Sequence, residues 1–134
     1  MRRTLLALIA SAVVFAASAA GLGTTDRMYV DGVSIDPKTG AVVLMLVIDL
    51  PLEDGLTKPR AKSKILSYVN WMQSKSFTEA YPQARPAIGK LLVIAHIAPR
   101  NALGTSVLSQ VEGYARELGF ATKLQPLQPA ASAK

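Results

Sequence analysis

AVVLMLVID, residues 41–49, is the stretch that decides the fold of this chain. Its first eight residues are continuously apolar, which is the pattern of a β-strand covered on both faces. The preceding DPKTG, residues 36–40, supplies an Asp that starts a turn, a Pro that presets φ and a Gly for the left-handed exit. Residues 29–36 carry apolar Val33 and Ile35 between polar neighbours. The stretch therefore predicts a hairpin whose second strand is central in a sheet.

The rest of the chain shows the patterns of two helices and two further strands. Pro59 suits the first turn of a helix, and Gly119 is a C-terminal helix stop. The predicted helix, strand, helix and short edge strand occupy residues 58–75, 91–98, 101–118 and 121–124. The order ββαβαβ predicts an α+β fold with a mixed four-stranded sheet. Because strand–helix–strand crossovers are right-handed, both helices should lie on one face of that sheet.

This arrangement leaves one face of the sheet uncovered. The second and third strands are apolar on both faces, but two helices on one side cover only half of that surface. Something else must then bury the other face. The simplest answer is a homodimer through the sheet, and a ligand or a partner protein are the alternatives.

The N-terminus has the pattern of a secretory signal peptide. Arg2 and Arg3 precede the uncharged apolar residues 5–17, and an A-x-A pattern predicts cleavage after Ala19, with Ala20 as the near alternative. The rest of a twin-arginine signal is missing, so we expect the general secretion route to the periplasm or the medium, with membrane contact only before cleavage. The alternative is an uncleaved anchor and a membrane-tethered envelope protein.

The signal divides the chain into four parts. We predict a signal peptide, a flexible lead-in, one α+β domain and a disordered tail at residues 1–19, 20–27, 28–124 and 125–134.

Composition narrows the classes of function. The chain has 134 residues, 15 Lys and Arg against 9 Asp and Glu, and no Cys. Loss of Arg2 and Arg3 with the signal leaves a net charge of 13 minus 9, or +4. A net charge of this size is ordinary for a soluble domain and does not predict nucleic-acid binding. Without Cys, disulfides, thiolate metal sites and cysteine nucleophiles are excluded. No cofactor is expected.

Four stretches of the chain together resemble a known family. DGVSIDPKTGAVVLMLVIDL, KILSYVNWMQSKSFTEAYPQA, KLLVIAHIAP and a helix ending in ELGF resemble a bacterial family of small α+β domains of unknown function. Its stand-alone members are about as long as residues 28–124. The resemblance implies the fold and no activity, substrate or cofactor. Family members carry an aromatic residue shortly after the Asp that matches Asp49, where this chain has Leu50, Pro51 and Leu52, and typical members look cytosolic.

The first candidate site is catalytic. Asp49 ends the second predicted strand and His96 lies near the end of the third, at the edge where open sheets bind ligands. A carboxylate that orients an imidazole serves acid–base chemistry or metal binding. No nucleophile motif or ligand spacing accompanies the pair, and an isolated His on an apolar strand is commonly a core residue.

The second candidate is a basic stripe on the exposed side of the first helix. On a helical wheel Arg60, Lys64, Trp71 and Lys75 lie close together, so they could bind an acidic or anionic partner. The alternative is that Trp71 packs under residues 77–86 and the basic side chains are simply solvated.

The third candidate is a calcium or magnesium site at Asp49, Glu53 and Asp54. The dense acidic spacing of an EF-hand is absent, so we expect no metal there. The sequence therefore predicts an exported, non-enzymatic binding module that acts through the sheet face or the Trp71 stripe. The alternatives are a small envelope enzyme that uses Asp49 and His96, and the membrane-tethered protein.

Overall fold

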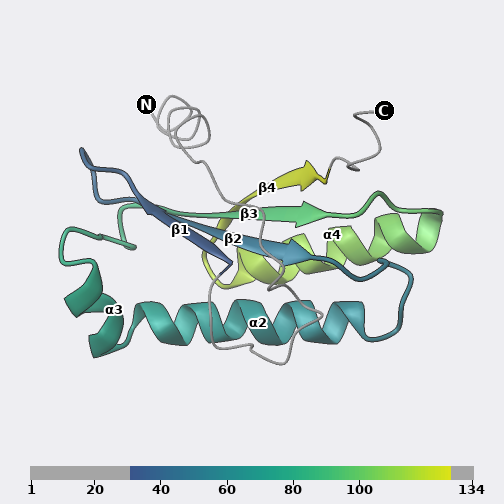
Figure 1. The fold of residues 1–134 in the computed structure, drawn as a ribbon, viewed down its shortest axis with the longest axis horizontal. Helices are drawn as coiled ribbons and strands as arrows, with labels where there is room; N and C mark the ends of the chain where they lie inside the picture. Colours follow the sequence, from purple (N-terminus) through teal and green to yellow (C-terminus); the bar gives the residue numbers. More distant parts are fainter. Residues whose placement is uncertain (1–30, 128–134) are drawn as a thin grey trace.

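A computed structural model of the chain describes residues 31–127. Among these residues the fold is α+β, with a four-stranded mixed sheet in the order β1-β2-β3-β4 and three helices (Figure 1). The signal peptide with its cleavage site at Ala19, the lead-in and residues 128–134 of the predicted tail lie outside the described residues.

The observed elements largely coincide with the predicted ones. In chain order they are β1 (Gly32–Ile35), β2 (Val42–Ile48), α2 (Thr57–Met72), α3 (Lys75–Ala80), β3 (Lys90–His96), α4 (Ala102–Glu117) and β4 (Ala121–Pro126). Two differences stand out. The short helix α3 was not predicted, and β4 continues two residues into the predicted tail.

The β1–β2 hairpin is built by the predicted turn. The two strands pair antiparallel, and the carboxylate of Asp36 accepts hydrogen bonds from the Lys38 N–H and the Thr39 hydroxyl, both at 3.0 Å. Gly40 adopts φ +84°, the left-handed conformation expected from its place in the sequence. The turn thereby delivers the chain into β2 in register with β1.

The centre of the sheet is the parallel pair β2 and β3. Their seven residues run in register from Val42 opposite Lys90 to Ile48 opposite His96, and every residue of β2 is buried. Side chains alternate between the two faces of a strand, so an entirely buried strand needs cover on both.

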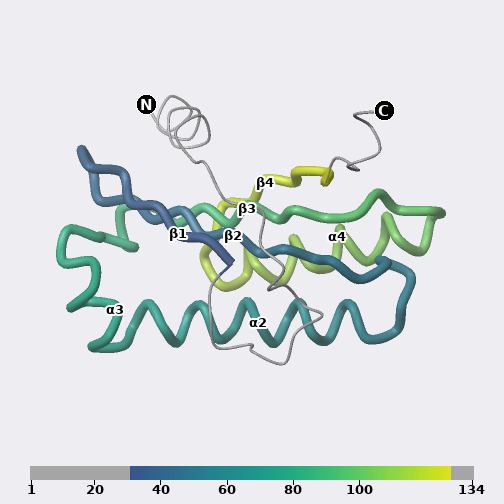
Figure 2. The backbone as a smooth tube through the Cα atoms, in the orientation of Figure 1, coloured from purple at the N-terminus to yellow at the C-terminus, as the bar shows by residue number. Residues whose placement is uncertain are grey.

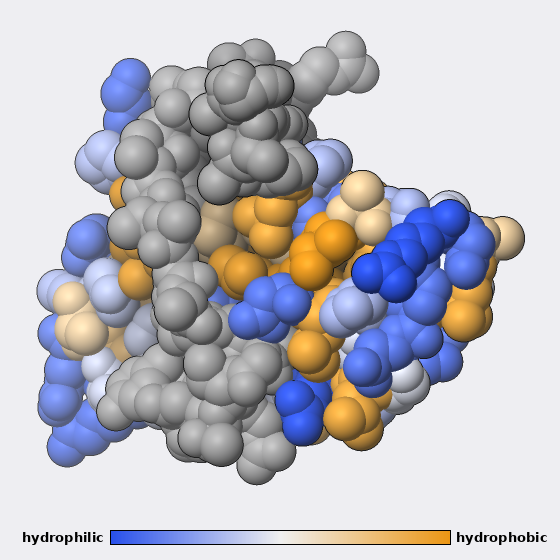
Figure 3. Space-filling model, turned by 45° about the vertical axis from the view of Figure 1, so that its right-hand side comes forward, coloured by the Kyte–Doolittle hydropathy of each residue, from blue (hydrophilic) through white to orange (hydrophobic). Residues whose placement is uncertain are grey.

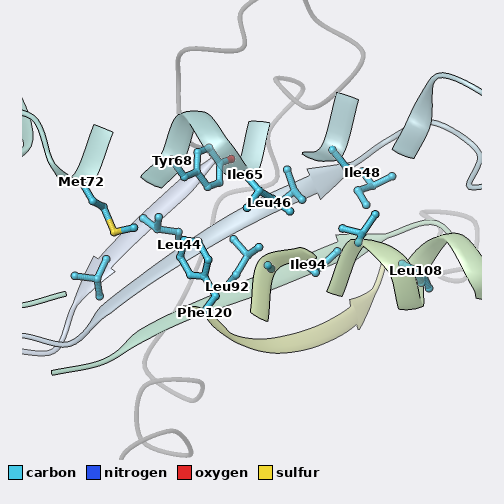
Figure 4. Packing of buried hydrophobic residues seen from close by; sticks show 14 of the residues in the cluster. Leu44, Leu46, Ile48, Ile65, Tyr68, Met72, Leu92, Ile94, Leu108 and Phe120 are labelled. Carbon is cyan, nitrogen blue, oxygen red and sulfur yellow. The ribbon is translucent and has the colours of Figure 1, made fainter. Parts of the chain in front are cut away.

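One face of this pair forms the main core. Leu44, Leu46 and Ile48 of β2, with Leu92 and Ile94 of β3, pack against buried side chains of the helices (Figure 4). Those helical residues include Ile65, Tyr68 and Met72 of α2, Phe77 of α3, and Leu108 and Val111 of α4. In Figure 1, α2 and α4 run along the same side of the strands.

The ends of the helices follow local capping rules. Asn101 accepts hydrogen bonds from the N–H groups of Leu103 and Gly104, which caps α4. Gly119 ends that helix with φ +98°, and the Phe120 N–H reaches back to the Ala115 carbonyl. Figure 2 traces the chain through this stop and into β4.

Helix α3 begins with Ser74 as its N-cap residue. The Ser74 hydroxyl, two residues after the end of α2, accepts a hydrogen bond from the Phe77 N–H at 3.2 Å. Six residues are too few to produce a recognisable helical period. For that reason the sequence predicted no separate helix between the first long helix and the third strand.

Two glycine substitutions should change stability in opposite directions. A Cβ at Gly40 would lie 2.6 Å from the Gln83 carbonyl oxygen in a left-handed conformation, so Gly40→Ala should destabilise by at least about 1 kcal/mol. A Cβ at Gly113, inside α4, meets nothing within 4 Å, so Gly113→Ala should stabilise by about 0.5–1 kcal/mol. Urea unfolding measures both, and equal shifts would contradict this assignment.

Candidate functional site

Asp49 and His96 lie at one edge of the sheet but in different surroundings. Ile48 is the register partner of His96, so Asp49 stands one residue beyond that pair. His96 is buried at 4% exposure, whereas Asp49 is exposed. A shift of one residue along a strand exchanges the face to which a side chain points. The two side chains predicted to act together therefore differ in burial, one inside the protein and one at its surface.

The ring of His96 makes a local backbone contact. Its Nδ1 lies 2.9 Å from the carbonyl oxygen of Ile97. Since a carbonyl only accepts, this contact places a proton on Nδ1. His96 is thus a buried residue that bonds to the backbone of its neighbour. This is the structural role that the sequence offered as the alternative to catalysis.

Glu53 joins two loops at the carboxyl ends of β2 and β3. Its Oε2 accepts a hydrogen bond from the Arg100 N–H at 2.7 Å, next to the start of α4. This bond lowers the pKa of the Glu53 carboxyl below its ordinary value of 4.5, because it favours the charged form. Gly104 leaves room for the carboxylate, since a Cβ there would clash with Oε2. Glu53 thus acts as a clamp between the loops.

The acidic residues of this edge do not gather into a metal site. Within residues 31–127 there is no group of three or more His, Asp or Glu side chains that could hold a metal ion. Asp54 instead accepts a hydrogen bond from the Leu56 N–H at 2.8 Å, an Asx turn just before α2.

The predicted basic stripe is not one exposed surface. Lys64 is buried at 1% exposure, and Lys75 belongs to α3 because α2 ends at Met72. Trp71 packs edge-on against the rings of Phe77 and Tyr81, at centroid distances of 4.8 and 6.0 Å. The aromatic residue therefore takes the packing role that was the alternative.

Lys64 forms a buried ion pair that the sequence did not reveal. Its ammonium lies 2.9 Å from both carboxylate oxygens of Asp31, and both side chains are 1% exposed. Asp31 lies directly before β1, and its carboxylate also accepts a hydrogen bond from the Val47 N–H at 2.7 Å. The Tyr68 hydroxyl adds a bond to the Met45 carbonyl at 3.0 Å. These side chains complete the β1-facing edge of β2 and fasten it to α2.

Burial and the neighbouring carboxylate act together on Tyr68. Burial raises the pKa of the Tyr68 phenol well above its ordinary value, and the negative charge of Asp31 raises it further. The hydroxyl therefore stays protonated and continues to donate to Met45.

The second face of the sheet is the largest feature not explained by the helices. Seven apolar residues form a separate cluster there: Ala41, Val43, Met45, Val47, Leu91, Val93 and Ala95. Each is at most 7% exposed, yet no residue of α2, α3 or α4 belongs to the cluster. The helices among residues 31–127 therefore contribute no residue to the second cluster. The continuous apolar run of β2 had predicted that this strand is buried on both faces.

Other hydrophobic side chains lie on the surface. Figure 3 shows them in orange, beside hydrophilic groups in blue. Leu56, Ile97, Leu103 and Leu127 come from segments that follow parallel strands or begin helices, and they are 38–56% exposed. They come from separate segments of the chain, and Leu103 lies in the first turn of α4.

Comparison with known proteins adds no further constraint. No protein-family model, curated protein or solved structure matches the chain. The resemblance to the family of small α+β domains thus stays a prediction. None of the helices in residues 31–127 is long and apolar enough to cross a membrane.

Substitution of Lys64 should show the cost of breaking the buried pair. Lys64→Met leaves the Asp31 carboxylate without its cation, which should lower the free energy of unfolding by about 3–5 kcal/mol. Adding Asp31→Asn should recover part of this loss. Lys75→Met is the control, since this lysine is 89% exposed and its removal should cost under about 0.5 kcal/mol. Equal losses for Lys64→Met and Lys75→Met would contradict a structural role for the pair.

The Glu53 clamp should be visible in a titration. NMR of the side-chain carboxyl should give Glu53 a pKa below 4.5, and Gly104→Ala should raise it toward 4.5 by displacing the carboxylate. Because the folded pKa is lowered, the clamp stabilises the fold above 4.5 and loses its effect as pH falls through the lowered value. Gly55→Ala is the control, since a Cβ there meets nothing within 4 Å. An unchanged Glu53 titration in Gly104→Ala would refute the clamp.

Proposed function

We propose that this chain is an exported binding module that acts through the second face of its sheet. The observation that carries the proposal is the apolar cluster on that face, which contains no residue of the described helices. In this interpretation the fold is a ββαβαβ unit with α2 and α4 on one face, and α3 is an accessory turn.

The surroundings of the catalytic candidates support binding over catalysis. His96 is buried and bonded to the Ile97 carbonyl, while Asp49 is exposed one register position away. General acid–base catalysis needs a titrating group within reach of substrate and of its orienting partner. A small envelope enzyme based on this pair is therefore the weaker alternative.

Export is part of the proposal and is supported by the sequence. Basic Arg2 and Arg3, the apolar residues 5–17 and the small residues up to Ala19 are the three regions of a secretory signal. We propose delivery to the periplasm or the medium by general secretion. The uncleaved, membrane-tethered form is the competing interpretation.

The basic stripe is not the binding surface in this proposal. Lys64 neutralises Asp31 inside the protein, and Trp71 packs with Phe77 and Tyr81. A buried lysine that already neutralises a carboxylate does not attract an anionic partner, and Lys75 lies on a different helix, α3. A partner for the apolar face is instead expected to be apolar.

Site-specific photo-crosslinking in a bacterial host tests the proposal. Lys123 is exposed in β4 and is the register partner of Val93, so a benzoylphenylalanine at this position borders the apolar face. The matched control is the same replacement at Ile88, which is 57% exposed and lies outside the cluster. We expect one discrete adduct from position 123 and none from 88. No adduct, or the same adducts from both positions, would overturn binding through this face.

A further inference from the structure

We propose that the outer edge of β4 pairs with the same edge of a second copy of the chain, so that two sheets join edge to edge. Strand β4 is the last in the order β1-β2-β3-β4, and it lies at the rim of the sheet in Figure 1. Five of its six residues are exposed, so this edge is open in a single copy. The inference goes beyond the proposed function, because it concerns the edge of the sheet and not its second face.

One hydrogen bond identifies the backbone groups of β4 that point away from β3. The Leu127 N–H donates to the His96 carbonyl at 2.7 Å, so residue 127 directs its backbone polar groups toward β3. Successive residues of a strand direct these groups to opposite sides. Thr122, Leu124 and Pro126 therefore present theirs to the open side. Thr122 and Leu124 each offer an N–H and a carbonyl there, whereas Pro126 offers a carbonyl alone.

This pattern of donors and acceptors is complementary to itself. In an antiparallel pair with a two-fold axis at Leu124, the two Leu124 residues exchange two hydrogen bonds. The Thr122 N–H of each copy then faces the Pro126 carbonyl of the other copy, which gives two more. All outward N–H groups of Thr122 and Leu124 are satisfied in this alignment. None of these bonds needs the N–H that proline lacks.

Lys123 and Pro126 restrict the register of the pair. Lysine and proline at a strand edge oppose indiscriminate pairing. With the axis at Leu124, Lys123 stands opposite Gln125 of the other copy. A shift that places Thr122 opposite Leu124 would bring the two Lys123 side chains directly opposite each other, which is unfavourable. A shift in the other direction places Leu124 opposite Pro126, where one hydrogen bond of each exchange lacks its N–H.

The same alignment covers an exposed apolar side chain. Leu124 is 36% exposed, and it is the register partner of Ile94 of the main core. The two Leu124 side chains would therefore meet beside the core, on the side of the sheet that carries the helices. Their contact is small, so hydrogen bonds between the two main chains supply much of the affinity, as in other cases of strand addition. A weak, concentration-dependent dimer is expected.

Sedimentation of the full chain tests this inference. Leu124→Pro removes an N–H that faces away from β3, so it keeps the hydrogen bonds between β3 and β4. It should weaken dimerisation roughly tenfold or more, because the symmetric pair loses two hydrogen bonds. Ala102→Pro is the matched control, since Ala102 is the exposed first residue of α4, where proline is well tolerated. This control should dimerise like the unaltered chain.

Engineered cysteines test the register without depending on the folding of the proline variant. The chain has no cysteine of its own. Lys123→Cys in one copy and Gln125→Cys in the other would stand directly opposite, with Cα atoms about 4.5 Å apart, within the range of a disulfide. Two copies of the same variant would place their Cβ atoms about 7 Å apart, which is too far. With oxidised glutathione, an equimolar mixture should therefore give more linked dimer than either variant alone.

Three results would overturn the inference. The first is a monomer at every concentration up to about 1 mM. The second is a dimer that a folded Leu124→Pro variant does not weaken. The third is an equal yield of linked dimer from the cysteine mixture and from each variant alone.

The photo-crosslink from position 123 reports on both surfaces, and Leu124→Pro separates them. An adduct of twice the chain mass that Leu124→Pro abolishes supports pairing of the edges. An adduct that Leu124→Pro leaves unchanged, with none of twice the chain mass, supports binding through the second face and overturns pairing of the edges.

Discussion

The parallel pairing of β2 with β3 is the constraint on which the rest of the structure depends. Parallel strands cannot be joined by a tight turn, so the chain must leave the end of β2 and return to the start of β3. Helix α2 makes this return and brings Ile65, Tyr68 and Met72 onto the sheet. Both strands carry apolar side chains on both faces along most of their length. The side chains of β2 and β3 thus form the centre of the hydrophobic core.

The Asp31–Lys64 pair links the edge of β2 to helix α2. Within residues 31–127, the four residues of β1 pair with Val42–Met45, so their ladder stops short of the last three residues of β2. The Asp31 carboxylate takes the Val47 N–H there, and Lys64 balances its charge. An open strand edge invites pairing with other chains. The Asp31 carboxylate satisfies one backbone N–H of this edge, at Val47.

The sequence predicted those parts of the fold that local chemistry determines. The continuous apolar run of β2, the Asp36 to Gly40 turn and the Gly119 stop each depend on neighbouring residues, and all three were found. The candidate site was less predictable. Lys64 and Asp31 are 33 residues apart, and a lysine beside a buried helical stripe gives no sign of its partner. Its spacing from Ala61 and Tyr68 was a usable signal, because positions three and four apart share a helix face.

The prediction that Asp49 and His96 act together failed because of an offset of one residue at the end of the strands. Both lie at the carboxyl edge, as expected, but the register places Ile48 opposite His96. One residue of offset decides which face a side chain joins. Register depends on the whole β2–β3 ladder, so it could not be obtained from the residues at its end.

The most direct test measures how strongly the amide hydrogens of β2 and β3 are protected from exchange with solvent. The amide hydrogens of Leu44, Leu46 and Ile94 should exchange only through global unfolding, because the strands that carry them are buried on both faces. Exchange of these amide hydrogens as fast as those of the six-residue helix α3 would contradict the central place of the β2–β3 pair.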